Sequence, residues 1–462
     1  MTKRDKALLL RLTKGLGAQG YSQVVQIFIR LAEVPLLLGF WGTRLYGEWL
    51  MLAAIPAYLA ICDGGFTGAA SREMSMRSGA GDRTRALAIF QSTWLFLLPC
   101  SLFFGSLAFV AVETAPFREW LGFEVMDLAT VKLVTLLLAT HVLVGFQTGL
   151  VYGGFYCEGH YAMGMVLSTT MQMIEFGGMA LAVVLGGGPL EAALGYLGGR
   201  IGGFFLMRLG LHRATPWLRY GWREATLGEV RRLAAPAFAS LAFPLGNALN
   251  IQGMRLVVGL ILGPPAVVGF SALRTLSRLS MQPSAIISRL IEPEMASAYG
   301  GNRTDDFRRL STRSCQVALW MSAVTGIALV VLGEKVLGIW THSKVAMDWT
   351  LYTLLLLSAV ANAIWYTALM AAYATNRHIK VALVYTVVYG AAAFSLAYIF
   401  TGISGLAGAG LALLLTELAM APYVLLKTFQ LTGESLASWL DQVARPPWFL
   451  FRRVRDVSVI HG

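Results

Sequence analysis

The chain has 462 residues, of which 56% are hydrophobic and only 13% are charged, and its mean hydropathy is +0.63. This composition supplies too little polar surface for a soluble protein of that length, so it excludes the soluble globular class and indicates a polytopic membrane protein. The formal net charge of +12 needs no nucleic-acid partner, because the basic residues fall mainly in loops on one predicted side of the membrane.

Apolar windows long enough to cross a hydrocarbon core of ~30 Å recur along the whole chain. They predict an all-α membrane protein with twelve transmembrane helices, at 17–39, 45–66, 88–112, 129–152, 163–186, 191–211, 236–262, 265–290, 314–333, 349–373, 380–400 and 405–426. With the N-terminus inside, the inner segments carry 26 Lys or Arg and the outer loops carry four. The positive-inside rule therefore predicts that both termini are cytoplasmic.

The first predicted helix carries a polar stripe inside its apolar sequence. Its members follow one another at steps of three and four residues and so share one face: Gln19, Gln23, Gln26, Arg30 and Glu33. A charge at membrane depth costs several kcal/mol and usually faces a cavity or a partner. Arg30 and Glu33 are therefore interpreted either as a mutually neutralising pair or as a ligand-binding arginine beside a coupling or gating carboxylate.

The seventh and eighth predicted helices also carry polar stripes that contain arginines. The seventh has a looser polar face formed by Asn247, Asn250 and Arg255. The eighth has a tighter one formed by Ser271, Arg274, Thr275, Arg278, Gln282 and Arg289, of which Arg289 lies near the inner end. Arg274 and Arg278 are one turn apart and repel each other, and no acid lies on that helix to compensate them. The stripes favour binding of an anion within the bilayer.

Single charges elsewhere in the apolar helices are more simply explained by packing. Glu175, Arg200 and Glu417 are expected to pair between helices, as Glu175 with Arg200, and His141 is expected to be a packed, hydrogen-bonding residue. The four cysteines show no disulfide or metal spacing. Nucleotide-binding, zinc-protease and serine-hydrolase motifs are absent, so the sequence predicts neither an enzyme nor a cofactor.

The two halves of the chain repeat. Arg30 precedes Gly39 by nine residues and Arg255 precedes Gly263 by eight, and similar Glu-Met segments follow in both halves, at 73–74 and at 294–295. The repeat predicts a six-helix lobe at 1–211, a cytoplasmic linker at 212–235, a second six-helix lobe at 236–427 and a basic amphipathic tail at 428–462. Six helices return the chain to its starting side, so the lobes are expected to be related by a pseudo-two-fold axis along the membrane normal.

The run RLAEVPLLLGFWGTRLYGEWLMLAAIPAY at 30–58, then DGGF at 63–66, resembles the polysaccharide transporter family of the multidrug/oligosaccharidyl-lipid/polysaccharide exporter superfamily, which includes the O-antigen flippases. RLVVGLILGPPAVVGFSALRTLSRL at 255–279 supports the resemblance. It covers nearly the whole chain in helix number and duplication, with diffuse motifs.

This resemblance implies a two-lobed transporter that works by alternating access in the bacterial cytoplasmic (inner) membrane. The implied substrate is an undecaprenyl-diphosphate-linked oligosaccharide moved from the inner to the outer leaflet, and the implied partners are membrane lipids and other polysaccharide-assembly proteins. The residues expected to bind the substrate are Gln26, Arg30, Asn250, Arg255, Arg274, Arg278 and Gln282, with Glu33 in coupling or gating.

Two other functions remain open at this point. A cation-coupled multidrug antiporter of the same fold would place acids where this chain has arginines. A glycan polymerase would need a long outer loop, whereas the longest predicted outer loops, 113–128 and 334–348, are short.

Overall fold

The structure is a computed structural model that describes residues 3–300, 302–375 and 379–447. All regular structure in these ranges is helical. The elements are α1 (Lys3–Ala57), η1 (Tyr58–Ile61), α2 (Phe66–Gly79), α3 (Arg83–Thr114), α4 (Phe117–Trp120), α5 (Leu128–Gly154), α6 (Tyr161–Val184), α7 (Pro189–Ala214), α8 (Leu227–Ser240), α9 (Ala242–Ala248), η2 (Leu249–Gly253), α10 (Met254–Leu262), α11 (Pro264–Ser277), η3 (Arg278–Met281), α12 (Gln282–Gly300), α13 (Thr304–Trp340), α14 (Trp349–Ala368), α15 (Met370–Ala374), α16 (Ile379–Val387), η4 (Val388–Ala392), α17 (Ala393–Thr432) and α18 (Leu436–Ala444).

Eight helical segments of the described chain are long and apolar enough to cross a membrane, as expected of a multi-pass membrane protein. Two of them, Gly17–Ile61 and Lys380–Thr432, have 45 and 53 residues. At 1.5 Å per residue these are about 68 and 80 Å long, more than twice the ~30 Å hydrocarbon thickness. Each of these two segments contains a non-helical break, at Gly42 and at Ser404–Gly405 respectively.

The breaks need glycine because of their backbone conformation. Gly42 (φ 74°, ψ −177°) and Gly263 (φ 82°, ψ 168°) adopt almost the same angles, in a region essentially closed to residues with a Cβ. One of these glycines follows the first polar stripe and the other follows Arg255, while the sequence repeat itself stays a prediction. Gly39, which the sequence repeat pairs with Gly263, has helical backbone and lies three residues before the break at Gly42.

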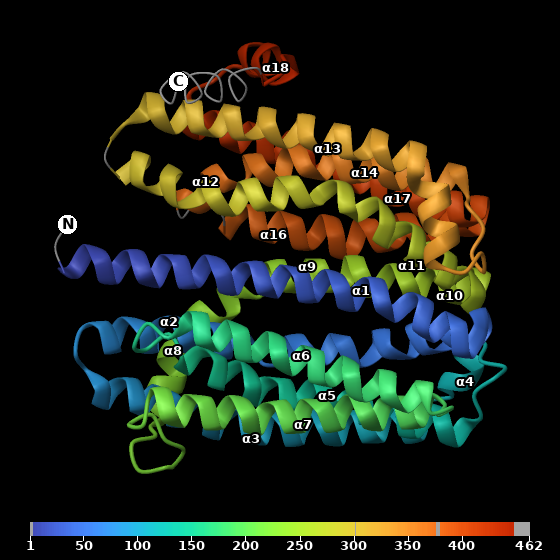
Figure 1. Cartoon of the computed structure of the whole chain (residues 1–462), viewed down its shortest axis with the longest axis horizontal. Coiled ribbons are helices and arrows are strands. Elements are labelled where there is room, and N and C mark those ends of the chain that lie inside the picture. The colour runs from blue at the N-terminus through green and yellow to red at the C-terminus, as the bar shows by residue number, and fades with distance from the viewer. Residues whose placement is uncertain (1–2, 301, 376–378, 448–462) are drawn as a thin grey trace, which may run out of the picture. The chain divides into compact units, whose positions relative to one another are not determined.

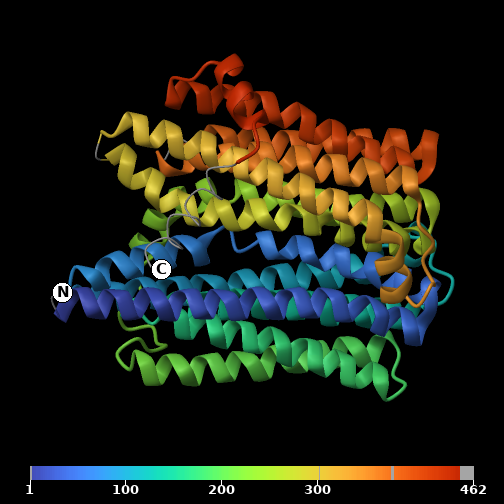
Figure 2. The same cartoon turned by 45° about the horizontal axis from the view of Figure 1, so that its top comes forward.

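The helices group into two compact units. Unit 1 contains residues 1–268 and 340–344, and unit 2 contains 269–339 and 345–462. Figures 1 and 2 show that the long helices within each unit run along a common direction. The lobe boundary predicted at the 212–235 linker stays a prediction, because this division groups segments by packing and not by sequence repeat.

The predicted linker packs onto unit 1. The amide of Gln91 on α3 donates to the carbonyl of Arg219 (3.1 Å) and accepts from the backbone N–H of Glu224 (3.0 Å), and the Ser92 hydroxyl accepts from the N–H of Thr226 (2.9 Å). Thr226 then caps α8 through the N–H of Glu229. Because irregular backbone must find hydrogen-bond partners, these buried α3 side chains fix the path of the linker into α8.

The segment 340–344 also packs in unit 1, against the first half of α1. The indole N–H of Trp340 donates to the carbonyl of Leu31 (2.5 Å), and the Lys344 ammonium donates to the carbonyls of Leu38 (2.9 Å) and Gly39 (3.0 Å). The last carbonyls before the break at Gly42 have no helical partner, so a lysine donor stabilises this helix end.

In unit 2, the short helix α18 packs on α13. Its Trp439 and Val443 are buried, and Gln316 and Trp320 of α13 donate to backbone carbonyls at its C-terminal end. The part of the predicted amphipathic tail at 448–462 lies outside the described residues. The part that is described is a helix with one packed face.

Candidate functional site

The sequence-predicted residues of unit 1 lie on two helical segments. Arg30 is exposed on α1 and forms no ion pair among the described residues, and Gln26 donates to the Ser22 hydroxyl (3.2 Å). Arg255 is half-buried on α10, where its guanidinium donates to the Gln252 side chain (3.2 Å). Asn250 is buried in the π-helical turn η2, one turn before Arg255.

Glu33 does not pair with Arg30. No ion pair joins them in the described chain, and the carboxylate of Glu33 lies within electrostatic range of the Arg255 guanidinium. The hydroxyl of Tyr46 is within range of both. Arg255 on α10, and not Arg30 on the same stripe of α1, is therefore the arginine that acts on Glu33.

A buried charged cluster lies deeper in unit 1, between α5, α6 and α7. Glu175 and His141 are 2% and 5% exposed. The Nε of Arg200 lies 3.1 Å from Glu175 Oε1 and 3.1 Å from His141 Nε2, and His141 Nε2 lies 3.2 Å from Glu175 Oε2. Tyr196 stacks on the His141 ring at a centroid distance of 4.1 Å. The predicted pairing of Glu175 with Arg200 is confirmed.

His141 Nε2 has two close partners, Arg200 Nε and Glu175 Oε2, but this nitrogen can form only one hydrogen bond in its ring plane. His141 Nε2 either accepts the single N–H of the Arg200 Nε or donates its own proton to Glu175, because one ring nitrogen cannot do both. In the second case Arg200 turns entirely to Glu175 Oε1. The two cases differ by the proton on His141 Nε2, so a change of histidine tautomer or protonation redistributes the hydrogen bonds among α5, α6 and α7 while Glu175 stays ionised beside Arg200.

A cavity of about 190 Å³ in unit 1 opens onto both carboxylates. Glu33 and Glu175 line it together with Gln172 and Tyr196, and its apolar wall consists of Ile29, Trp49, Ala53, Leu138, Phe176 and Met179. Two carboxylates in one cavity would repel each other, but Glu33 faces Arg255 and Glu175 faces Arg200. The cavity is thus polar at two points and close to neutral overall.

Glycines on α6 and α7 let these two helices approach closely enough to form the cluster of Glu175, His141 and Arg200. A Cβ on Gly178 would lie 2.4 Å from the carbonyl oxygen of Gly195, and a Cβ on Gly199 would lie 2.5 Å from Glu175 Cα. On Gly203 it would lie 2.1 Å from Met171 Cγ. Such close backbone approach is typical of membrane helices that pack through small residues. It brings Glu175 and Arg200, which belong to different helices, within ion-pair distance.

The predicted residues of unit 2 lie near the point where the helix tightens. Arg274 is half-buried on α11, with its guanidinium 5.6 Å from the centre of the Phe270 ring. Arg278 begins the 3₁₀ turn η3, and Gln282 begins α12 directly after it, half-buried. A change from α to 3₁₀ winding alters the angle between successive side chains, so the single straight stripe expected from the sequence is interrupted at Arg278.

Arg278 lies within electrostatic range of a buried carboxylate of unit 2, that of Glu417. Glu417 on α17 is 6% exposed, and its Oε2 accepts from the amide of Asn362 (3.0 Å) and from the indole N–H of Trp365 (2.8 Å). Glu417 was expected to pair between helices, and its hydrogen-bond donors Asn362 and Trp365 are neutral side chains of α14.

No group of three or more His, Cys, Asp or Glu is placed to hold a metal ion among the residues that the structure describes. The residues that the sequence predicts to bind substrate fall into two separate sets of side chains, one in each unit. Unit 1 carries Gln26, Arg30, Glu33, Asn250 and Arg255, and unit 2 carries Arg274, Arg278 and Gln282.

Neither a protein-family model nor a curated protein matches this sequence. The fold is nevertheless found in solved structures. A multidrug resistance MATE family transporter of the MOP superfamily, in its inward-facing conformation, is similar with a TM-score of 0.69 at 16% identity, over 88% of this chain and 99% of that one. The lipid II flippase MurJ, in an inward closed conformation, has a TM-score of 0.68 at 15% identity over 96% of both chains.

A MOP superfamily transporter from Pyrococcus furiosus, described as having a binding pocket of reversed polarity, has a TM-score of 0.63 at 14% identity over 92% of this chain and 96% of that one. At identities of 14–16%, these structural similarities show the fold alone. The chain has the helical fold of MOP superfamily transporters.

Proposed function

We propose that this protein is a flippase that moves an undecaprenyl-diphosphate-linked oligosaccharide from the inner to the outer leaflet of a bacterial cytoplasmic membrane by alternating access. The observation that carries the proposal is the set of arginines held in apolar helices: Arg30, Arg255, Arg274 and Arg278. The fold shared with a lipid II flippase supports it. Other polysaccharide-assembly proteins are the proposed partners.

The proposed topology has twelve spans, in two six-helix lobes, with both termini cytoplasmic. The breaks at Gly42 and Gly405 support it, since each divides a helical segment too long for one crossing. Reporter fusions at Glu119 and Ser343 should read as external and one at Thr226 as cytoplasmic. An external signal at Thr226 would contradict the topology.

The arginines suit a diphosphate because of their charge and geometry. A guanidinium stays charged at every working pH and offers a fork of N–H donors to phosphate oxygens. The neutral donors Gln26, Asn250 and Gln282 are proposed to add hydrogen bonds to the same headgroup. Arg278→Lys should keep part of the transport activity, because it keeps the charge, and Arg278→Glu should lose almost all of it.

The test is transport of a lipid-linked oligosaccharide in proteoliposomes containing the purified protein. The double variant R274E/R278E should lose translocation. The matched control R219E/R223E makes the same change of charge at two exposed residues of the linker and should transport normally. Wild-type rates from correctly inserted R274E/R278E protein would refute arginine-based recognition.

The membrane potential is the proposed driving force. An inside-negative potential favours outward movement of a negative headgroup by about 2.3 kcal/mol per charge per 100 mV across the full field. A potassium-diffusion potential, negative on the cytoplasmic side, should therefore accelerate translocation. Absence of any response to the potential, with strict dependence on an ion gradient, would reject this mechanism.

A cation-coupled antiporter of the same fold is the second candidate. The cavity shared by Glu33 and Glu175 favours it, since carboxylates facing one cavity can exchange a proton or a cation. The arginine partners of both acids count against it, because they already balance the charges. Glu33→Gln should abolish ion-driven drug export if antiport is correct, and should leave potential-driven glycan transport measurable if the flippase is correct.

A further inference from the structure

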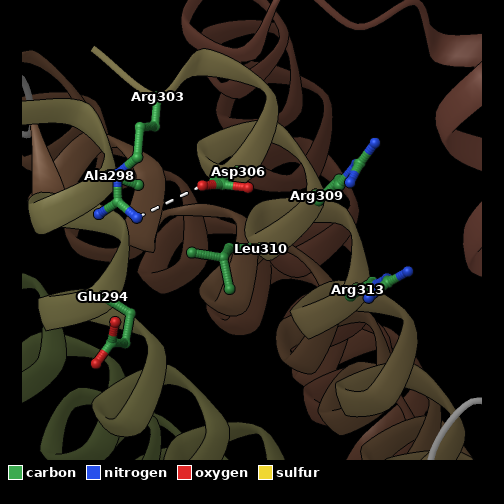
Figure 3. Close-up of a pocket in the computed structure, with 7 residues that line it drawn as sticks. All are labelled: Glu294, Ala298, Arg303, Asp306, Arg309, Leu310 and Arg313. Atoms are coloured by element: carbon green, nitrogen blue, oxygen red, sulfur yellow. Dashed lines mark hydrogen bonds and ion pairs between the residues drawn. The ribbon is translucent and has the colours of Figure 1, made fainter. Parts of the chain in front are cut away.

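The long helix α13 has different surroundings at its two ends. At its N-terminal end, a cavity of about 240 Å³ lies between it and the end of α12, and Arg303 and Asp306 form an ion pair there at 3.5 Å (Figure 3). At its C-terminal end the chain leaves unit 2, and residues 340–344 pack in unit 1 before the chain returns to unit 2. The segment 340–344 forms a clasp on helix α1.

Two features of α1 interrupt its backbone hydrogen bonding. Pro35 has no N–H, so the carbonyl of Leu31, four residues earlier, receives no hydrogen bond from that position of the helix. The break at Gly42 ends the regular winding and leaves the carbonyls of the preceding turn at a helix end. Backbone groups inside a bilayer find no water, so their missing donors must come from elsewhere in the protein.

The clasp supplies donors at both interruptions. The indole N–H of Trp340 donates to the carbonyl of Leu31 (2.5 Å). The ammonium of Lys344 donates to the carbonyls of Leu38 (2.9 Å) and Gly39 (3.0 Å), in the turn before the break. Two side chains of the clasp thus complete the backbone bonding of α1 on both sides of its proline.

The turn that carries Lys344 is strained. His342 and Ser343 have φ of 51° and 58°, in the left-handed region that residues with a Cβ seldom adopt. The N–H of Lys344 donates to the carbonyl of Thr341 (3.1 Å) and closes the turn. Thr341 and Val345, on either side of it, are 0% and 9% exposed. Strain of this kind persists where the surrounding structure fixes the conformation, and it is common at functional sites.

We propose that Trp340 and Lys344 are positioning residues for the polar stripe of α1, an inference that rests on the proposed function. Leu31 lies between Arg30 and Glu33 in the chain, so the indole bond is made within the stripe itself. A helix bends at a proline because the missing hydrogen bond removes a restraint. With the carbonyls on both sides of the proline held, the bend is fixed, and the stripe keeps one direction relative to the rest of α1.

Hydrogen exchange of the full-length protein in nanodiscs tests the clasp without a transport substrate. Trp340→Phe keeps an aromatic ring and removes the N–H donor, so the amides of residues 32–43 should exchange at least about fivefold faster, as expected for one lost hydrogen bond. Trp320→Phe is the matched control, because it makes the same change on the same helix, where the indole donates to the carbonyl of Val443 (3.3 Å). It should leave exchange in 32–43 as it is in the wild type.

A second substitution separates the hydrogen bond from packing. Pro35→Ala restores a backbone N–H four residues after Leu31, which can donate to its carbonyl in place of the indole. In the Pro35→Ala protein, adding Trp340→Phe should therefore change exchange by less than about twofold. Equal acceleration with and without Pro35→Ala would show that the indole does not replace the missing donor. At the second contact, Lys344→Met should speed exchange, whereas Lys344→Arg, which keeps N–H donors, should not.

Translocation of a lipid-linked oligosaccharide in proteoliposomes tests the positioning role. Trp340→Phe should lower the initial rate at least about threefold, and in the Pro35→Ala protein it should cause no further loss. The proposal is wrong if Trp340→Phe leaves exchange in 32–43 as Trp320→Phe does, or accelerates it without slowing transport. If the wild-type protein moves no lipid-linked oligosaccharide, the proposed function fails, and the exchange results alone decide whether the clasp holds α1.

Discussion

The packing of α6 on α7 gives a sharp test of how the buried cluster is positioned. In Gly199→Ala the new methyl carbon would lie 2.5 Å from Glu175 Cα and 2.8 Å from the Ile174 carbonyl oxygen, whereas ordinary contacts are 3.4–4 Å. Because these are backbone atoms, the helices must separate by about 1 Å, and overpacking of this kind typically costs about 1–3 kcal/mol. The same displacement lengthens the contact between Arg200 and Glu175.

The neighbouring glycine is a matched control. A Cβ on Gly198 would meet nothing within 4 Å. Gly198→Ala should therefore be neutral or stabilising by about 0.5–1 kcal/mol, since alanine favours a helix over glycine. We expect Gly199→Ala to lower the midpoint of thermal unfolding by about 2–6 °C in detergent at a fixed scan rate. Equal midpoints for the two variants would refute close backbone contact between α6 and α7.

Three further predictions follow from single residues. Gly42→Ala should destabilise the protein by about 1–3 kcal/mol because of its φ of 74°, while the helical control Gly39→Ala should not, as thermal unfolding will show. Glu48→Gln should cost about 2 kcal/mol and speed hydrogen exchange of the 121–127 loop, because the buried carboxylate accepts three backbone N–H groups at 2.7–2.8 Å. Cys157 should resist maleimide at pH 7.5 in intact protein and react after unfolding, because burial, assisted by the Glu158 carboxylate, raises its pKa to about 12.

The features predicted from the sequence are those that depend on local pattern. Apolar windows predicted a multi-pass helical protein because a bilayer requires about 20 apolar residues for each crossing, and eight helical segments of the described chain meet that requirement. An intramembrane charge needs a partner, which is why the pairing of Glu175 with Arg200 could be predicted before the helices were placed.

The features that the sequence did not reveal depend on which helices are neighbours. Arg30 and Glu33 share a stripe, but Glu33 lies near Arg255, more than two hundred residues away in the chain. The glycines of α6 and α7 were visible only as composition, because contact across a helix pair depends on rotation about both axes.

Two of the buried carboxylates, Glu175 and Glu417, are held in different ways, and this difference predicts which charge the fold requires. Glu175 balances Arg200, whose side chain is only 18% exposed, while Glu417 accepts hydrogen bonds from two neutral donors, with Arg278 acting at longer range.

Removing one partner of a buried ion pair leaves an uncompensated charge and costs about 3–5 kcal/mol. Glu175→Gln should therefore lower the unfolding midpoint strongly, while Glu417→Gln keeps an oxygen for Asn362 and Trp365 and should lower it much less. Both substitutions preserve side-chain size, so charge is the variable that changes. If Glu417→Gln proved the more damaging, the fold would depend on the negative charge beside Arg278, and the neutral donors would not account for the burial of Glu417.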